Sequence, residues 1–389
     1  MGGWEVAHVQ GPALYRALGT YRFALAFMVL VSHTWTFSAP GSFVHNVGLG
    51  NVAVMAFFIL SGFIIAEAID AFYLGRPGAF LANRALRLIP PYWGAVLVSI
   101  CVHASMWRLG TLQLQDYAAP PVDAMLSWQN ALVQLTAIVP VFNFNNILPD
   151  REWYYFVRFA WAIFVEFVFY GAVAACMIGF SVGGKFLSAR TYCIACVVGA
   201  LSVHAISEYL RPLHSSFAYI PYFAFGVCAY AAVTRDDWVA KLVAAVALFA
   251  AVLHFIRYTQ GRVNLSAAWL EGLASPPVWT AVLLLVGCGL AIFPLSRVRL
   301  SSAAVRRDKW FGDLAYPLYL NHYAVIVLVL SLEGLGVASQ ITAVIGSLIL
   351  AWTMKIAIER PMVALRNRIR GADLAIVEPT SSAPQLHTV

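Results

Sequence analysis

Apolar residues fall into long, nearly uninterrupted blocks along the whole chain, separated by short segments that contain Arg, Lys, Pro and Gly. About 20 apolar residues in an α-helix are needed to cross roughly 30 Å of hydrocarbon. The blocks have this length, and they predict about ten spanning helices. We expect these helices near residues 20–38, 48–68, 88–106, 155–178, 190–207, 217–234, 240–256, 277–294, 314–332 and 338–358. The predicted fold class is therefore an all-α polytopic membrane protein.

Composition supports this prediction and excludes several other classes of protein. Of the 389 residues, 61% are hydrophobic and 11% are charged, whereas soluble domains carry about 25% charged residues. A water-exposed domain of this length could not cover its surface with so few charges. A soluble enzyme, a nucleic-acid-binding protein and a disulfide-stapled secreted domain are therefore excluded.

The net charge of +7 reports membrane orientation rather than a nucleic-acid partner. Most of the 25 Lys and Arg residues fall on one side of the predicted helices, which is the side of both chain ends. Because positive loops stay in the cytoplasm, we expect both termini to be cytoplasmic.

We expect one transmembrane domain over residues 1–361 and a cytoplasmic tail over 362–389. The tail is first basic and then polar, and so is expected to be disordered at its end. The longest loop, about 107–154, is expected outside. Its amphipathic stretch near 123–137 predicts a lid or an interfacial helix.

Ionisable residues inside the apolar blocks are the candidate functional groups, because each costs roughly 2.5–3.5 kcal/mol to insert. Arg22 and His33 lie on one face of the first predicted helix, about 16 Å apart along its axis. A cation at one end of this face and a titratable base at the other would suit an elongated substrate. The structural alternative is a snorkelling arginine and a histidine that is hydrogen-bonded in the core.

Arg84 and Arg87 stand before Pro90-Pro91 at the cytoplasmic start of the third predicted helix. With an i, i+3 spacing they share a helical face and could grip phosphate oxygens. An ordinary positive flank of a membrane helix explains the same pattern.

Glu166 lies midway along the fourth predicted helix and His322 deep in the ninth. A carboxylate at mid-membrane must be paired, protonated or functional. A Glu–His pair would orient an imidazole and stabilise its charged form, as a general base requires. A structural hydrogen bond between helices remains the alternative. Other histidines lie near outer helix ends and receive no role: His45, His103, His204, His214 and His254.

No metal site is expected. Cys193 and Cys196 form a C-x-x-C inside an apolar block, but no second pair or adjacent histidine accompanies them. Two apolar thiols are the simpler interpretation.

At this point several motifs resemble those of one known family. Arg22 and His33 match its arginine–ten residues–histidine motif in the first helix. The run FLANRALRLIPPYWGAV at 80–96 is similar to its R-x-x-R-hydrophobic-x-P-x-Y-W signature, with Arg84 and Arg87 as the arginines.

Further blocks follow in the family's order. The segment AFFILSGFIIA at 56–66 resembles FFxLSGFLI, and WAIFVEFVFYG resembles the W-x-L-x-x-E-x-x-F-Y block through Glu166. LAYPLYLNHYAV resembles S-Y-x-L-Y-L-x-H through His322, and IERP at 358–361 closes the region. The chain is similar in these blocks to the acyltransferase-3 family of membrane O-acyltransferases.

Two positions depart from the family pattern. Gly19 stands where an acidic residue usually precedes the first-helix arginine, and Ala315 replaces a frequent serine. The first departure weakens any role for a carboxylate at that position.

The resemblance implies transfer of an acyl group, usually acetyl, from cytoplasmic acyl-CoA to a hydroxyl of a surface or exported saccharide, such as a polysaccharide, O-antigen or lipo-oligosaccharide. It implies a bacterial cytoplasmic membrane, with membrane lipid and saccharide as partners and no nucleic acid. On this hypothesis Arg22, Arg84 and Arg87 hold the donor, and His33 is the base. Glu166 or His322 then orients or stabilises His33.

A transporter or flippase of lipid-linked saccharides is the competing hypothesis, since spanning helices with buried charges suit it as well. We find no internal repeat and no matched pair of broken helices in the sequence, features that transporters often show. An intramembrane protease needs a nucleophilic serine or a metal site. Ser61-Gly62 lacks the rest of such a serine motif, and the chain lacks H-E-x-x-H.

Overall fold

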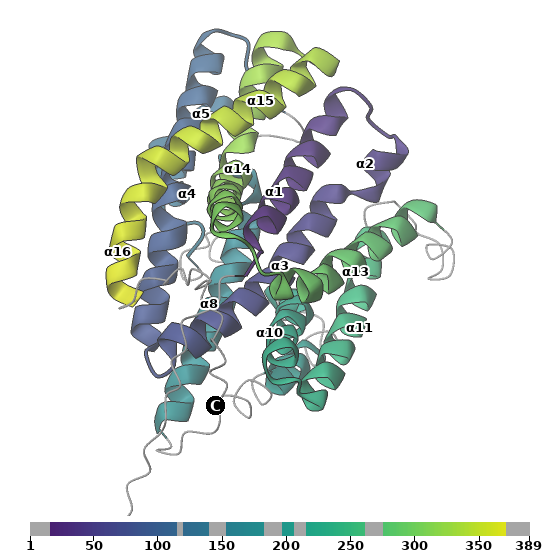
Figure 1. Ribbon diagram of the computed structural model, residues 1–389. Coiled ribbons are helices and arrows are strands. Elements are labelled where there is room, and N and C mark those ends of the chain that lie inside the picture. The colour runs from purple at the N-terminus through teal and green to yellow at the C-terminus, as the bar shows by residue number, and fades with distance from the viewer. Residues whose placement is uncertain are drawn as a thin grey trace, which may run out of the picture.

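The computed structural model describes residues 16–114, 120–139, 153–182, 197–205, 215–260 and 275–370. Within these ranges the regular structure is helical (Figure 1). The elements are α1 (Gly19–Thr34), η1 (Trp35–Phe37), α2 (Phe43–Val47), α3 (Leu49–Ala68), η2 (Ile69–Tyr73), α4 (Pro77–Arg108), α5 (Val122–Met125), α6 (Trp128–Gln134), η4 (Arg158–Ala160), α8 (Trp161–Val182), η5 (Ser215–Tyr219), α10 (Ile220–Arg235), α11 (Trp238–Gln260), α13 (Pro276–Arg297), α14 (Ser302–Glu333), α15 (Val337–Met354), η6 (Lys355–Glu359) and α16 (Arg360–Arg370).

Eight helices in the described ranges are long and apolar enough to cross a membrane. The helix α1 is shorter, with 16 residues, and η1 continues it to Phe37. Of the predicted block 190–207, residues 197–205 are helical and the rest lies outside the described residues. The prediction of an all-α polytopic membrane protein is confirmed.

Two helices extend well beyond the predicted blocks. The helix α4 begins at Pro77 instead of near residue 88, and continues through Pro90 and Pro91. Neighbouring helices can satisfy the backbone groups that a proline frees inside a membrane helix. The helix α14 begins at Ser302, where the hydroxyl of Ser301 accepts a hydrogen bond from the amide of Ala304. Hydropathy had located only the apolar parts of both helices.

The helices α14 and α3 form the centre of the protein. In the most apolar window of α14, 89% of the residues are buried inside the protein, and in that of α3 together with its flanking turns 72% are. Only 33% of the residues are buried in the most apolar windows of α4, α8, α11 and α13. The other residues of these windows are available to face lipid. The central pair therefore provides the surface on which a buried site can be built.

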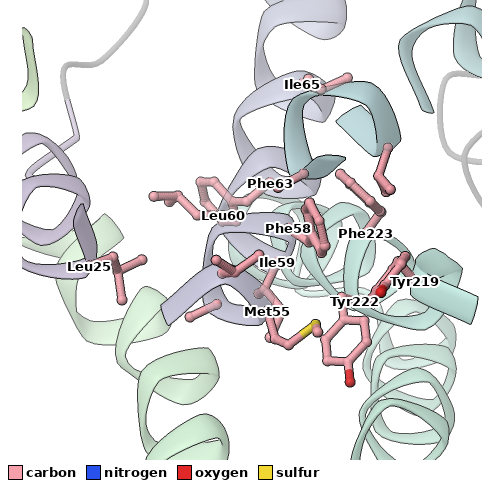
Figure 2. Packing of buried hydrophobic residues seen from close by; sticks show 14 of the residues in the cluster. Leu25, Met55, Phe58, Ile59, Leu60, Phe63, Ile65, Tyr219, Tyr222 and Phe223 are labelled. Atoms are coloured by element: carbon pink, nitrogen blue, oxygen red, sulfur yellow. The ribbon is translucent and has the colours of Figure 1, made fainter. Parts of the chain in front are cut away.

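Close backbone contact joins α3 to α10. A Cβ at Gly226 would lie 2.0 Å from the carbonyl oxygen of Ile59, and one at Gly62 would lie 2.2 Å from that of Phe223. Small residues allow such approach between membrane helices. Figure 2 shows Phe58 of α3 facing Phe223 and Tyr219 across this interface.

The helix α1 packs against α14 just as closely. A Cβ at Gly19 would lie 2.1 Å from the carbonyl oxygen of Asp308, and one at Gly312 would lie 2.8 Å from the Cα of Gly19. The Asp308 carboxylate accepts hydrogen bonds from the amides of Gly19 (2.8 Å) and Thr20 (2.7 Å) at the start of α1. The departure at Gly19 thus has a physical reason: a side chain there would clash, and a carboxylate reaches the same place from α14.

The predicted outer loop contains two short helices, α5 and α6, among its described residues. Met125 packs against Tyr154, Phe156 and Tyr323, whereas Trp128 is 71% exposed. The segment therefore has one face on the protein and one face available to the membrane interface. Its role as a lid stays a prediction.

Candidate active site

A cavity between the helices gathers four of the six predicted site residues. Arg22 of α1, Arg84 and Arg87 of α4 and Glu166 of α8 all line it, together with residues of α3 and α14. Its volume is about 70 Å³, whereas one water needs at least roughly 10–15 Å³ on the same measure. This arginine cavity can therefore hold several waters or a thin chain.

Arg84 is the most deeply buried charge of the arginine cavity. It is 5% exposed, and its guanidinium carbon lies 5.6 Å from the ring centre of Tyr170 and 5.7 Å from that of Phe80. These cation–π contacts hold the guanidinium in place. Its Nε has no hydrogen-bond partner among the described residues, and a buried donor of this kind calls for a ligand or water.

Glu166 is held on the same side of the site as the arginines. Its Oε1 accepts hydrogen bonds from the Ser61 hydroxyl at 2.8 Å and from the Tyr170 hydroxyl. Glu166 also lies within electrostatic range of Arg84. These contacts and the cavity lining place the carboxylate in the arginine cavity, and its pairing with a histidine stays a prediction.

His33 and His322 lie together in a second group, the histidine cluster, which we define as these two residues and Phe159. The ring centres of His33 and His322 are 5.3 Å apart, and Phe159 stacks on them at 3.9 Å and 5.0 Å. The two imidazoles face each other with an interplanar angle of 23°. Helices α1 and α14, which meet closely at Gly19 and Gly312, thus each supply one histidine.

The two histidines differ in access. His33 is partly exposed, whereas His322 is 1% exposed. The Nδ1 of His322 lies 3.3 Å from the carbonyl oxygen of Leu318; because a carbonyl only accepts, Nδ1 donates. The Nε2 of His322 has no hydrogen-bond partner among the described residues. His33 is therefore the more accessible of the two histidines, and His322 presents a buried acceptor beside it.

Tyr319 links the two groups. It lines the arginine cavity, its hydroxyl donates to the carbonyl oxygen of Phe159 at 2.7 Å, and its ring centre lies 6.1 Å from that of His322. Tyr316, one turn earlier on α14, also lines the cavity and donates to the carbonyl oxygen of Leu88 at 2.9 Å. The helix α14 therefore runs from the arginine cavity to the histidine cluster.

The sequence analysis did not assign Phe159 or Ser61 to the site. Both are residue types that are common in membrane helices, so nothing in the sequence sets them apart. Tyr319 and Tyr170 were visible only as members of the family motifs. Their hydroxyls inside apolar blocks were the available signal, since a buried tyrosine hydroxyl usually has a partner.

No group of three or more His, Cys, Asp or Glu suited to a metal ion occurs within the described ranges. Cys193 and Cys196 lie outside those ranges.

One comparison with known proteins found a match. The profile of a family described as "Acyltransferase domain", the acyltransferase-3 family, matches residues 16–356, which include all six predicted site residues. A search of curated proteins found no match, and neither did a search of solved structures. The matched region covers nearly the whole chain and both residue groups, so the chain belongs to the acyltransferase-3 family and is a multi-pass membrane acyltransferase.

Proposed function

We propose that the protein transfers an acetyl group from cytoplasmic acetyl-CoA to a hydroxyl of a cell-surface or exported saccharide in the bacterial cytoplasmic membrane. The observation that carries this proposal is the pairing of the arginine cavity with the histidine cluster along α1 and α14. Three arginines suit an anionic donor, and an accessible imidazole suits a hydroxyl acceptor.

On the donor side, Arg22, Arg84 and Arg87 bind the phosphates of acyl-CoA or the start of its thin arm. Guanidinium groups form charge-assisted, often bidentate hydrogen bonds with phosphate oxygens. Glu166 holds Tyr170 and Ser61 and balances part of the arginine charge, so we assign it to positioning the donor. Both termini are cytoplasmic in this proposal, because the positive-inside rule places the arginine end of α1 there.

On the acceptor side, neutral His33 removes the proton of the saccharide hydroxyl as its oxygen attacks the thioester carbon. A C–O bond forms, the C–S bond breaks, and the proton passes from His33 to the departing thiolate, which yields the O-acetyl ester and CoA. His322 lies against His33 and stabilises its charged form through the free lone pair on Nε2 and through the shared stack with Phe159.

The test is the O-acyl ester content of surface glycans in a strain that lacks this protein, measured by mass spectrometry and NMR. The strain would carry the wild-type gene, the His33→Ala gene or the His45→Ala gene at matched membrane levels. His45 is an exposed histidine on α2 and serves as the control. We expect wild type and His45→Ala to restore esters, and His33→Ala not to do so.

An identical ester content in all strains would overturn the proposal and leave export of lipid-linked saccharide as the function to test. The ester spectrum would also identify the acyl group and the acceptor sugar.

A further inference from the structure

The helix α16 follows the family-matched region, which ends at residue 356. Most of it lies in the basic first part of the predicted cytoplasmic tail. In Figure 1, α16, coloured yellow, runs along α4, coloured blue, and the two helices are in contact. Because α4 carries Arg84 and Arg87, the position of α16 relative to the arginine cavity has consequences for donor binding.

Specific hydrogen bonds fix α16 against α4. Asn83, which is 2% exposed, donates through Nδ2 to the carbonyl oxygen of Arg366 at 2.9 Å. The Nε of Arg366 donates back to Asn83 Oδ1 at 3.4 Å. Arg76 donates to the carbonyl oxygens of Ile369 (3.1 Å) and Arg370 (3.2 Å) at the end of α16, where a cation is favourable. These bonds set both the position and the rotation of the helix.

The fixed rotation divides the arginines of α16 into two sets. Arg366 and Arg370 are partly buried, whereas Arg360 and Arg368 are exposed. The guanidinium of Arg370 lies over the ring of Phe72, 5.0 Å from its centre. Arg366 faces Asn83, the residue next to Arg84 in the sequence. Asn83 forms hydrogen bonds with both the backbone carbonyl and the side chain of Arg366. The exposed set, Arg360 and Arg368, is thus available to lipid headgroups. The partly buried set, Arg366 and Arg370, faces the protein.

Arg366 consequently joins a cluster of like charges. It lies within electrostatic range of Arg84, Arg87 and Arg370, and of the Glu359 carboxylate. Like charges held together in a partly buried place repel one another, and a guanidinium cannot relieve this by losing its proton near neutral pH. Arg84 adds a buried Nε without a partner among the described residues. A ligand with several negative charges would compensate both features.

We propose that Arg366 is a phosphate-binding residue of the acyl-donor site, so that α16 forms part of that site. This inference rests on the proposed function and extends it. Coenzyme A carries a 3′-phosphate and a diphosphate, which suit a group of guanidiniums spread over two helices. Phosphates of anionic lipids share this chemistry, but Arg366 is turned toward Asn83 and the arginines of α4, whereas Arg368 is turned outward.

The experiment measures the Kd of acetyl-CoA by calorimetry on the full chain in phosphatidylcholine nanodiscs. The variants are Arg366→Gln, Arg366→Lys and, as the matched control, Arg368→Gln. Gln removes the charge and keeps most of the side-chain volume, and Lys restores the charge. We expect a 10- to 100-fold weaker Kd, roughly, for Arg366→Gln, since it loses a charge-assisted hydrogen bond. Lys should recover part of the loss, and Arg368→Gln should stay within about 2-fold of wild type.

A second titration with 3′-dephospho-CoA identifies the phosphate. If Arg366 contacts the 3′-phosphate, wild type and Arg366→Gln should bind this probe about equally. If it contacts the diphosphate, the difference between them should persist. Either result supports the assignment to the donor site.

Three results would overturn the inference, and they differ in what they imply. If Arg366→Gln binds acetyl-CoA like wild type while Arg84→Gln does not, α16 lies outside the donor site and the proposed function stands. If Arg366→Gln is impaired only in nanodiscs that contain phosphatidylglycerol, Arg366 serves lipid headgroups. If wild type itself binds no acetyl-CoA, the proposed function fails together with the inference.

Discussion

The arginine cavity and the histidine cluster are built by different forces, although both draw on α1 and α14. The cavity has a largely apolar lining, on which guanidiniums, a carboxylate and tyrosines converge from several helices. The histidine cluster is a stack of three rings, with His322 bonded only to its own helix among its described partners. Charge would select the ligand in the first region, and ring packing sets the position of the base in the second.

The difference indicates how donor binding in the arginine cavity and proton transfer at the histidine cluster occupy separate places at a fixed distance. Arg22 and His33 share α1, while Tyr319 and His322 share α14. The close contact of Gly19 with Gly312, and the Asp308 carboxylate on the start of α1, fix these helices against each other. The separation of Arg22 from His33, and that of Tyr319 from His322, is therefore set by two helices held in close contact. Our central claim is that loss of either region leaves the function of the other intact.

The largest effect is expected at the base. In vitro, His33→Ala should slow acetyl transfer by about 10²–10⁴-fold, the usual contribution of a general base, while the KM for acetyl-CoA changes little. Single-turnover kinetics on the purified protein would measure this. A variant that transfers at more than about a tenth of the wild-type rate would rule His33 out as the base.

A smaller effect, on binding rather than rate, is expected in the arginine cavity. Arg84→Gln and Arg87→Gln should each raise the KM for acetyl-CoA by about 10- to 100-fold, because each removes a charged hydrogen-bond donor. The turnover of bound donor should be nearly preserved. The control is Arg306→Gln, an exposed arginine at the start of α14. A fall in kcat with unchanged KM would place these arginines at the reacting atoms instead.

The pair Glu166→Gln and His322→Ala sharpens the comparison. Glu166 contacts Ser61 and Tyr170 beside the arginines, so its variant should change the KM for the donor. His322 stacks near His33, so its variant should lower kcat, by about 10-fold if it removes roughly 1.4 kcal/mol of stabilisation. Steady-state kinetics with varied donor would separate the two. A lower kcat for Glu166→Gln together with a changed KM for His322→Ala would support Glu166 as the orienting partner of His33.

Disturbing the helix pair should affect both regions at once. Gly19→Ala forces a Cβ toward the backbone of Asp308 and should destabilise the protein by about 1–3 kcal/mol, as overpacking does. Gly171→Ala is the matched control, because a Cβ there meets nothing within 4 Å. Thermal unfolding in nanodiscs would compare them. Equal midpoints for the two variants would show that the α1–α14 contact is not tight.

The smallest effect is expected at the cap of α1. Asp308→Ala should cost about 1 kcal/mol, the usual loss of a helix cap, and Asp308→Asn less, because the amide oxygen can still accept one bond. The same unfolding assay measures both. If Asn is as destabilising as Ala, the negative charge of Asp308, rather than its hydrogen bonds, supports α1.

Sequence reasoning located the charged residues of the site because an arginine or glutamate inside an apolar block is costly and therefore conspicuous. Arg22 and Glu166 were identified in this way, and Arg84 and Arg87 by their shared helical face and by the family motif. The cavity brings all four together. The cost of inserting a single charged residue does not predict which residues pair. The spacing of Glu166 and His322 along the chain says nothing about which helix faces approach each other.

Other features could not be foreseen from the chain. Phe159 stacks on both histidines, yet an aromatic residue in an apolar block carries no signal. The start of α4 at Pro77 was missed because hydropathy locates only the apolar part of a helix, and the residues before position 88 include Arg84 and Arg87. Arg366 read as part of a surface tail, because only docking of α16 on Asn83 turns it toward the arginines.

The most direct test of the central claim is the Kd of acetyl-CoA for His33→Ala beside that for Arg87→Gln, measured in the same nanodiscs. The account predicts that His33→Ala binds the donor within about 2-fold of wild type while transferring acetyl at least about 10²-fold more slowly. It predicts that Arg87→Gln binds the donor at least about 10-fold more weakly. Equal loss of donor binding in both variants would contradict it, because the histidine cluster would then be part of the donor site.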